Sequence, residues 1–290
     1  MLTQANTESP IKPNYKMWKE DGALKILTIG NSFSVDSMKY VYQIAKAAGI
    51  ENIELGNLYI SGCSLAMHLN KARNDLPAYT YYTNNNGEWH ENLSFKLADA
   101  VKSNNWDFIS FQQASAKSGL VDSYDDLNAL MDIVKPLCTN ENVKFVWHMT
   151  WAYQSDSTHS GFATYNNNQN TMYSDIISAV QQKIVSNERI VKVIPNGTAV
   201  QNARTSYIGD SLTRDGYHMS YAQGRVLTGV TMVAALAGID YWDNLDISSI
   251  SGDTLFNKVV FESVKNAIYN PFEITQSKFA DLENLIDRSN

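Results

Sequence analysis

The sequence lacks the cysteine and histidine patterns that mark metal-binding and disulfide-stapled proteins. It contains two cysteines, Cys63 and Cys138, and five histidines spread along 290 residues. None of them falls at the spacing of a zinc site, so we expect no bound metal. One disulfide could join the two cysteines, but we favour two buried thiols.

The sequence also lacks the charge and hydrophobic runs of nucleic-acid-binding and membrane proteins. The formal net charge is -7, and no cluster of Lys and Arg stands out, which argues against nucleic acid as a partner. No apolar run reaches the roughly 18 residues of a membrane span. The longest candidate, residues 226–238, is interrupted by Gly229 and predicts a buried helix. We therefore expect no membrane partner.

The first 23 residues are polar and contain Pro10 and Pro13, which is typical of a loose lead-in. They show no basic segment followed by an apolar one, so no signal peptide is recognised in this chain. A polar lead-in is equally what a removed signal would leave behind. The sequence therefore leaves a secreted or periplasmic location open, and it says nothing about the oligomeric state.

What the chain does contain is typical of a globular α/β protein. Strand and helix patterns alternate with short connections, which predicts a mostly parallel sheet covered by helices on both faces. We expect a flavodoxin-like three-layer sandwich with five strands, at about residues 24–29, 53–60, 106–111, 143–149 and 190–195. We expect the lead-in at 1–23, the main domain at 24–240 and a helical extension packed on it at 241–290.

One segment interrupts the alternation. Residues 78–90 alternate Tyr and Thr, turn at Asn86-Gly87 and continue to Trp89, which predicts a β-hairpin insertion. A helix is expected directly after it, at about 93–103. The 16 Tyr, the 6 Trp and many Asn are a balance common in proteins that handle sugars, because aromatic faces stack on pyranose rings and amides bond hydroxyls.

The chain is organised around the stretch from Leu24 to Ser34. Its first residues are apolar and predict a buried strand, and Gly30 allows a sharp turn after it. An amphipathic pattern at about 37–48 predicts the next helix, capped by Asp36 or Ser34. Ser32 would then lie at the carboxyl end of the first strand, where open α/β sheets bind ligands. By itself it is either a turn residue or a nucleophile.

Other polar residues follow the later strands and can meet Ser32 at the same sheet edge. Gly62 follows the second strand, Gln112 and Gln113 follow the third, and Asp215 and His218 lie on a late loop. Together they supply the parts of an acyl-transfer site. A histidine activates the serine, a carboxylate orients the histidine, and N–H donors stabilise the oxyanion.

These residues carry a resemblance to a known superfamily. Gly30-Asn31-Ser32-Phe33 resembles the Gly-Asp-Ser-Leu turn of the GDSL/SGNH hydrolases, Gly62 its second-block glycine, and Asp215-Gly216-Tyr217-His218 its Asp-x-x-His block. The matches come in the family's order and span about residues 24–237. The resemblance implies a Ser32–His218–Asp215 esterase that needs no metal or cofactor and often removes O-acetyl groups from carbohydrates.

The third block departs from the usual Gly-x-Asn-Asp, whose Asn completes the oxyanion hole. Here Phe111-Gln112-Gln113 resembles the Gln-bearing version of carbohydrate acetylesterase-like relatives. We expect the backbone N–H groups of Ser32 and Gly62 to form the hole with one glutamine side chain, and we favour Gln112 over Gln113. Asn31 replaces the usual Asp, which is mainly structural.

A literal Gly-Asp-Ser-Leu occurs at Gly209-Asp210-Ser211-Leu212, but no apolar strand precedes it. We therefore reject Ser211 as the nucleophile. No Gly-x-Ser-x-Gly elbow is found either, which disfavours an α/β-hydrolase. Further candidates for contact with a substrate are Asn31, Trp89, His148 and Trp151, although packing is the default interpretation for the last three.

The sequence thus predicts a serine esterase that acts on a small-molecule or glycan ester. The alternative is a sugar-binding protein on the same fold that has lost catalysis, because the third block is altered and the hairpin is aromatic. A lipase or thioesterase is a weaker hypothesis, since the polar, Asn-rich loops argue against a long apolar acyl site.

Overall fold

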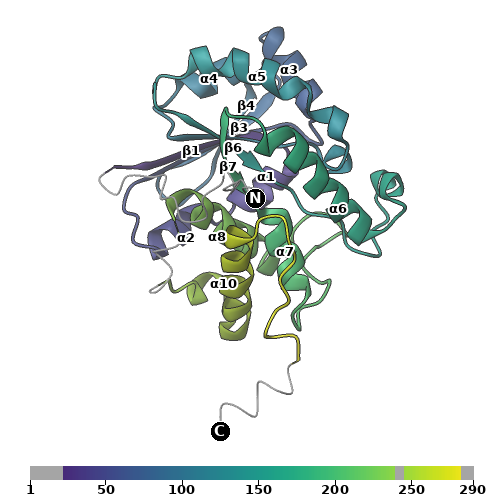
Figure 1. The fold of residues 1–290 in the computed structure, drawn as a ribbon. Helices are drawn as coiled ribbons and strands as arrows, with labels where there is room; N and C mark the ends of the chain where they lie inside the picture. Colours follow the sequence, from purple (N-terminus) through teal and green to yellow (C-terminus); the bar gives the residue numbers. More distant parts are fainter. Residues whose placement is uncertain (1–21, 239–244, 282–290) are drawn as a thin grey trace, which may run out of the picture.

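A seven-stranded sheet forms the centre of the computed structural model, which describes residues 22–238 and 245–281 (Figure 1). Its strands lie in the order β4-β3-β2-β1-β5-β6-β7. Their bounds are β1 Leu24–Gly30, β2 Ile53–Tyr59, β3 Tyr79–Asn84, β4 His90–Phe95, β5 Phe108–Phe111, β6 Lys144–His148 and β7 Ile190–Ile194.

Five of the strands are parallel, as the sequence predicts. β1 pairs with β2 on one side and with β5 on the other, and β6 and β7 continue the sheet. The order 2-1-3-4-5 of these five strands is that of flavodoxin-like folds. Leu24, Ile26 and Ile29 of β1 are fully or almost fully buried because helices cover both faces. The flavodoxin-like α/β sandwich is confirmed.

The hairpin extends the sheet as two antiparallel edge strands, β3 and β4. The expected helix at 93–103 starts only at Leu97, because β4 continues to Phe95. Phe95 pairs with Tyr79, and its ring lies 4.7 Å from that of Tyr81. This aromatic contact across the hairpin explains why the strand runs longer than the sequence suggests.

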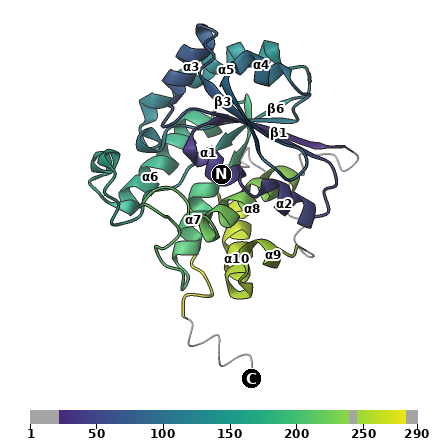
Figure 2. The same cartoon turned by 180° about the vertical axis from the view of Figure 1, so that it is seen from behind.

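Helices form a layer on each side of the sheet (Figures 1 and 2). One layer contains α3 Leu65–Arg73, α4 Leu97–Lys102 and α5 Asp126–Val134. The helix α6 Gln169–Val180 lies in the connection from β6 to β7. The other layer contains α1 Ser32–Met38, α2 Val41–Ala47, α7 Asn196–Arg204, α8 Gln223–Ala237 and α10 Thr254–Tyr269, with the short α9 Ser248–Ser251 beside it.

Short helical segments complete the connections. They are 3₁₀ turns at Ser115–Lys117, Val121–Tyr124, Lys135–Leu137 and Ser160–Tyr165, and one π-helical turn at Gln181–Val185 after α6. The Ser160–Tyr165 turn lies in the polar loop after β6. None of the helices within the described ranges is long and apolar enough to cross a membrane.

The first helix begins earlier than the sequence suggests. Asn31 caps α1 by accepting the N–H of Phe33 at 3.0 Å, so Ser32 is already the first helical residue. A second helix, α2, then begins at Val41, and neither Ser34 nor Asp36 is a cap. Both side chains make tertiary contacts instead, which a local helix pattern does not predict.

The C-terminal part packs against the main body. α10 lies against α7 and α8 in the same layer. The sequence also predicts a final helix at about 275–286, but this is wrong for the described part, because residues 275–281 are not helical and bond to the end of α7 and the segment after it. Thr275 donates to Asn202 at 2.7 Å, and the carbonyl of Phe279 accepts from Tyr207 at 2.8 Å.

The remainder of that expected helix and nearly all of the lead-in lie outside the described residues. The division of the chain at residues 23 and 240 stays a prediction.

Candidate active site

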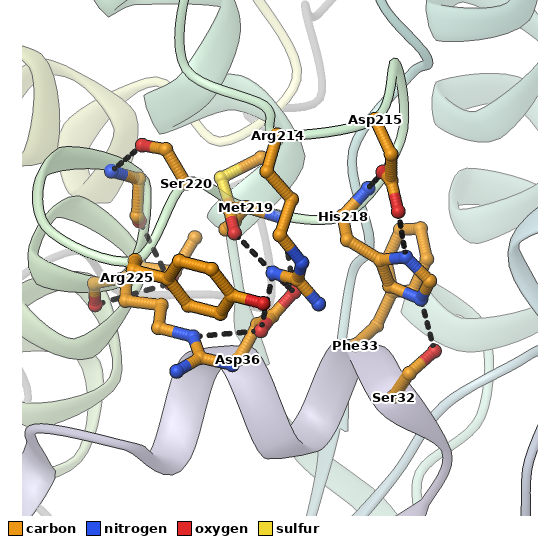
Figure 3. Close-up of polar contacts among 12 residues, drawn as sticks. Ser32, Phe33, Asp36, Arg214, Asp215, His218, Met219, Ser220 and Arg225 are labelled. Atoms are coloured by element: carbon orange, nitrogen blue, oxygen red, sulfur yellow. Dashed lines mark hydrogen bonds and ion pairs between the residues drawn. The ribbon is translucent and has the colours of Figure 1, made fainter.

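Ser32, His218 and Asp215 form a continuous chain of hydrogen bonds (Figure 3). Ser32 Oγ lies 2.7 Å from His218 Nε2, and His218 Nδ1 lies 2.7 Å from Asp215 Oδ2. Ser32 is held at the end of β1 by the start of α1, and the other two residues lie on the loop before α8. The sheet therefore brings together two segments that are 186 positions apart in the sequence.

Asp215 fixes both the position and the charge state of this chain. Its other oxygen, Oδ1, accepts the backbone N–H of His218 at 2.8 Å and that of Tyr217 at 3.3 Å. Partial burial alone would raise the pKa of Asp215, but the ring and backbone N–H bonds from His218 outweigh it and lower this pKa. An ionised Asp215 favours the proton on Nδ1, which leaves Nε2 free to accept from Ser32.

A buried carboxylate ties the histidine loop to the helix that begins at Ser32. Asp36 of α1 is fully buried and accepts from Arg225 Nε at 2.8 Å, from Arg214 Nη1 at 3.0 Å and from the backbone N–H of Met219 at 2.9 Å (Figure 3). Met219 directly follows His218. The position of the imidazole relative to Ser32 therefore depends on this cluster.

The backbone N–H groups expected to form the oxyanion hole, those of Ser32 and Gly62, lie on two segments that a hydrogen bond joins. Ser32 begins α1, so its N–H has no acceptor within the helix. Gly62 lies on the exposed turn after β2 with a left-handed φ of 59°, which favours glycine. The turn is tied to the serine segment, because Asn31 Nδ2 donates to the carbonyl of Cys63 at 3.1 Å. The geometry is compatible with an oxyanion hole built from the backbone.

The expectation that a glutamine side chain completes this donor set is wrong. Both Gln112 and Gln113 are almost fully buried, and the amide of each already donates to a protein acceptor. Gln112 Nε2 donates to Asn31 Oδ1 at 2.7 Å. Gln113 Nε2 donates to the carbonyl and to the hydroxyl of Ser123, and the Gln113 oxygen accepts from the backbone of α3 and of Ala114.

Gln112 belongs to a buried polar network beneath the site. Its oxygen lies 3.1 Å from His148 Nδ1, and His148 Nε2 lies 2.8 Å from Asn196 Nδ2 and 3.2 Å from Ser37 Oγ. Burial lowers the pKa of His148 to about 3, so its ring is neutral at physiological pH. The network holds Asn31 in the orientation that caps α1, and it thereby positions Ser32.

Three of the four further residues that the sequence suggested for contact with a substrate are buried instead. Asn31 and His148 are buried in the network, and Trp151 is fully buried. The Trp151 ring stacks on Phe33 at 4.3 Å, and its N–H donates to the carbonyl of Tyr217 at 2.7 Å. Trp89 is half-buried and lines a cavity between α1 and the hairpin.

Sequence analysis missed an aromatic wall next to His218. The Tyr217 ring lies 4.2 Å from His218, His159 packs edge-on against Tyr217 at 4.7 Å, and Tyr153 lies beneath both. Tyr217 and His159 are partly exposed. The signal was available in part, because Tyr217 lies inside the Asp-x-x-His block and His159 lies in a polar, Asn-rich loop after the fourth predicted strand.

The remaining sequence candidates lie away from this site. Ser211 Oγ donates to the carbonyl of Ile208 at 2.8 Å, and Asp210 forms an ion pair with Arg204. Both cysteines are free; Cys63 is buried, and Cys138 is only half-buried. Within the part of the chain that the structure describes, no group of three His, Cys, Asp or Glu side chains could hold a metal ion.

The fold and the site define a three-layer α/β protein with a Ser–His–Asp chain at the carboxyl edge of its parallel strands. The sequence model of one protein family, the domain of unknown function DUF4886, matches residues 25–246. The chain belongs to this family. A DUF4886 family protein from Bacteroides uniformis has a similar crystal structure, with 38% identity and a TM-score of 0.83 over 88% of this chain and 98% of that one.

More distant structures share the fold. The acetylxylan esterase Axe2 from Geobacillus stearothermophilus is 13% identical, with a TM-score of 0.50 over 77% of this chain and 98% of that one. A catalytic mutant of the same esterase gives 14% identity and a TM-score of 0.51 over the same shares of the two chains. No curated protein matches the chain.

Proposed function

We propose that the protein is a serine esterase of the SGNH type that removes O-acetyl groups from a carbohydrate. The observation that carries this proposal is the unbroken chain from Ser32 Oγ through His218 to Asp215, with 2.7 Å at each contact. Nucleophile, base and orienting group are thus all within hydrogen-bond distance before a substrate arrives.

The reaction follows from these contacts. As Ser32 Oγ attacks the ester carbonyl, its proton passes to His218 Nε2, and the carboxylate of Asp215 stabilises the resulting imidazolium. The N–H groups of Ser32 and Gly62 donate to the oxyanion. His218 then gives the proton to the departing sugar hydroxyl, which leaves an acetyl group on Ser32. A water molecule, deprotonated by the same histidine, hydrolyses this intermediate and restores the serine.

The surroundings of the site support a sugar ester over a long-chain acyl ester. The partly exposed Tyr217 and His159 rings form a wall beside His218, and a pyranose ring can stack on such faces. The polar loop after β6 borders this wall. The fold that the chain shares with an acetylxylan esterase is consistent with the proposal, but the support for it comes from the residues of the site.

The test is hydrolysis of p-nitrophenyl acetate by the wild-type protein and by Ser32→Ala. We expect kcat/KM to fall at least about 10³-fold in the variant, because the nucleophile is lost. Ser211→Ala is the matched control and should retain wild-type activity. Equal loss in both variants would refute the assignment of Ser32, and a wild-type protein that cleaves no acetyl ester, including acetylated xylo-oligosaccharides, would refute the esterase.

One observation favours the second candidate, a carbohydrate-binding protein without catalysis. Both glutamines of the third block are buried, so no side-chain donor from that block supplements the two backbone N–H groups. This candidate predicts glycan binding that survives Ser32→Ala, in a protein that hydrolyses no ester. The absence of ester hydrolysis, together with binding of xylo-oligosaccharides in a calorimetric titration, distinguishes it from the esterase.

A further inference from the structure

A cavity of about 250 Å³ lies between α1 and the β-hairpin, apart from the Ser–His–Asp chain. Its walls include Val35 and Lys39 from the α1 segment, Asn57 from β2, Tyr82 and Trp89 from the hairpin, and Arg225 from α8. The volume is below the roughly 300–1,000 Å³ of pockets that enclose a drug-sized ligand. The cavity therefore suits a single ring or one small group.

The helix geometry connects this cavity to Ser32. Ser32, Val35 and Lys39 are spaced i, i+3 and i+7, so they share one face of α1, and all three are partly exposed. At 1.5 Å per residue, Val35 lies about 4.5 Å and Lys39 about 10.5 Å along the helix axis from Ser32. A ligand that presents one group to Ser32 can thus place a neighbouring group in the cavity.

The polar groups that line the cavity are chiefly hydrogen-bond donors. Asn57 is almost fully buried, and its oxygen already accepts from Thr28 at 2.8 Å and from Ser34 at 2.9 Å. Its Nδ2 has no acceptor among residues 22–238 and 245–281, and it borders the cavity. An amide N–H at the wall of a cavity that has no protein acceptor is free to donate to a ligand oxygen.

Two cations add positive charge at the same place. Arg225 uses Nε on Asp36 and stacks over Tyr221 at 4.7 Å, and its terminal nitrogens bond to no acceptor in the described ranges. The Lys39 ammonium likewise has no side-chain partner there. Asp36 is shared with Arg214, so it does not neutralise both arginines, and no carboxylate lines the cavity. The acidic residues beside this wall are Glu91, whose side chain hydrogen-bonds to that of Tyr82, and Glu88, which directly precedes Trp89.

From these contacts we infer that the cavity binds the carboxylate-bearing ring of an acidic sugar, next to the sugar whose ester reaches Ser32. Lys39, Arg225 and Asn57 Nδ2 donate to the carboxylate and to ring oxygens. Trp89 offers an aromatic wall, and its orientation is fixed because Nε1 donates to the carbonyl of Lys39 at 3.1 Å. The inference deepens the proposed function by naming the substrate class, and it rests on that function only for the ester.

Binding tests the cavity separately from catalysis. Ser32→Ala protein is titrated in a calorimeter with a methyl glucuronoside, with the corresponding methyl glucoside and with inorganic phosphate. We expect the glucuronoside to bind at least about tenfold more tightly than the glucoside, and added Lys39→Gln to remove this preference. The exposed Lys102 of α4, changed to Gln, is the matched control and should leave the preference intact.

Three results would overturn the inference. They are equal affinity for the two glycosides, a preference for the glucuronoside that survives Lys39→Gln, and binding of phosphate without binding of the glucuronoside. If the wild-type protein cleaves no acetyl ester but the binding preference is found, the proposed esterase fails and the acidic-sugar site stands. If ester cleavage is found without the preference, the esterase stands and this inference fails.

Discussion

At the scale of single residues, the site depends on which nitrogen of the His218 ring carries the proton. Asp215 accepts from both the ring and the backbone of His218, and its pKa is held below the usual value. The carboxylate therefore stays charged through mildly acidic pH.

Asp215→Asn should consequently reduce kcat/KM by about 10³–10⁴-fold, because an amide stabilises neither the required tautomer nor the imidazolium. The measurement is p-nitrophenyl acetate hydrolysis between pH 5 and 8, in the wild type and the variant. Asp156→Asn, on the neighbouring loop, is the control and should behave as the wild type. A variant that retains more than a tenth of the activity would show that Asp215 is not the orienting group.

The difference between predicted and observed roles is clearest for Gln112. Sequence order placed it correctly at the end of β5, because buried apolar runs followed by polar turns are local patterns. The direction of its side chain depends on Asn31 and His148, which lie 81 and 36 positions away. Such partners cannot be inferred from one sequence, so the buried network under Ser32 became visible only in the structure.

At the scale of elements, α1 and the loop before α8 act as one unit because Asp36 joins them. Arg214 and Arg225 both converge on this buried carboxylate. α1 begins at Ser32 and not near residue 37 because Asn31 caps it. The capping residue Asn31 and the buried anchor Asp36 both lie before residues 37–48, the amphipathic stretch from which the sequence predicts the helix.

Asp36→Asn should lower the free energy of unfolding by about 3 kcal/mol, since two partly buried guanidinium groups would lose their counter-charge. It should also lower kcat, because Met219 would no longer hold His218 in place. Urea unfolding and ester hydrolysis measure the two effects. Asp132→Asn removes an exposed ion pair with Arg189 and should leave both quantities near wild type; a similar loss in both variants would contradict this role of Asp36.

At the scale of the whole molecule, two fully buried histidines link folding to pH. Burial lowers the pKa of His68 and of His148 to about 3, whereas an unfolded histidine titrates near 6.5. Between these values the unfolded chain binds more protons than the folded one. Stability is therefore complete above about pH 6.5 and falls as the pH decreases toward 3.

Each of the two histidines should contribute a loss of about 1.4 kcal/mol per pH unit across this window. Urea unfolding at pH 7, 6 and 5 measures the slope. His68→Gln should make it shallower, whereas His90→Gln, at an exposed position on β4, should not change it. A free energy of unfolding that stays constant from pH 7 to pH 5 would contradict the prediction.

Much of the fold followed from the sequence, because five buried strands and their intervening helices repeat a strong pattern. The exceptions are segments whose structure depends on distant partners. β4 is mostly exposed and shows no clear alternation, so Leu93 and Ser94 suggested a helix until Phe95 was seen against the β3 tyrosines. Residues 275–281 are likewise held by hydrogen bonds to the segment from Asn202 to Tyr207.

The separation of 186 positions between the serine hydroxyl and the imidazole has a consequence for synthesis. A ribosome makes the strand that presents Ser32 well before it makes the loop that carries His218. Between these points the emerging polypeptide has a hydroxyl without a base. The proposed site is complete only when the segment from β1 to α8 has folded, so the expected ester hydrolysis would report the folding of that whole segment.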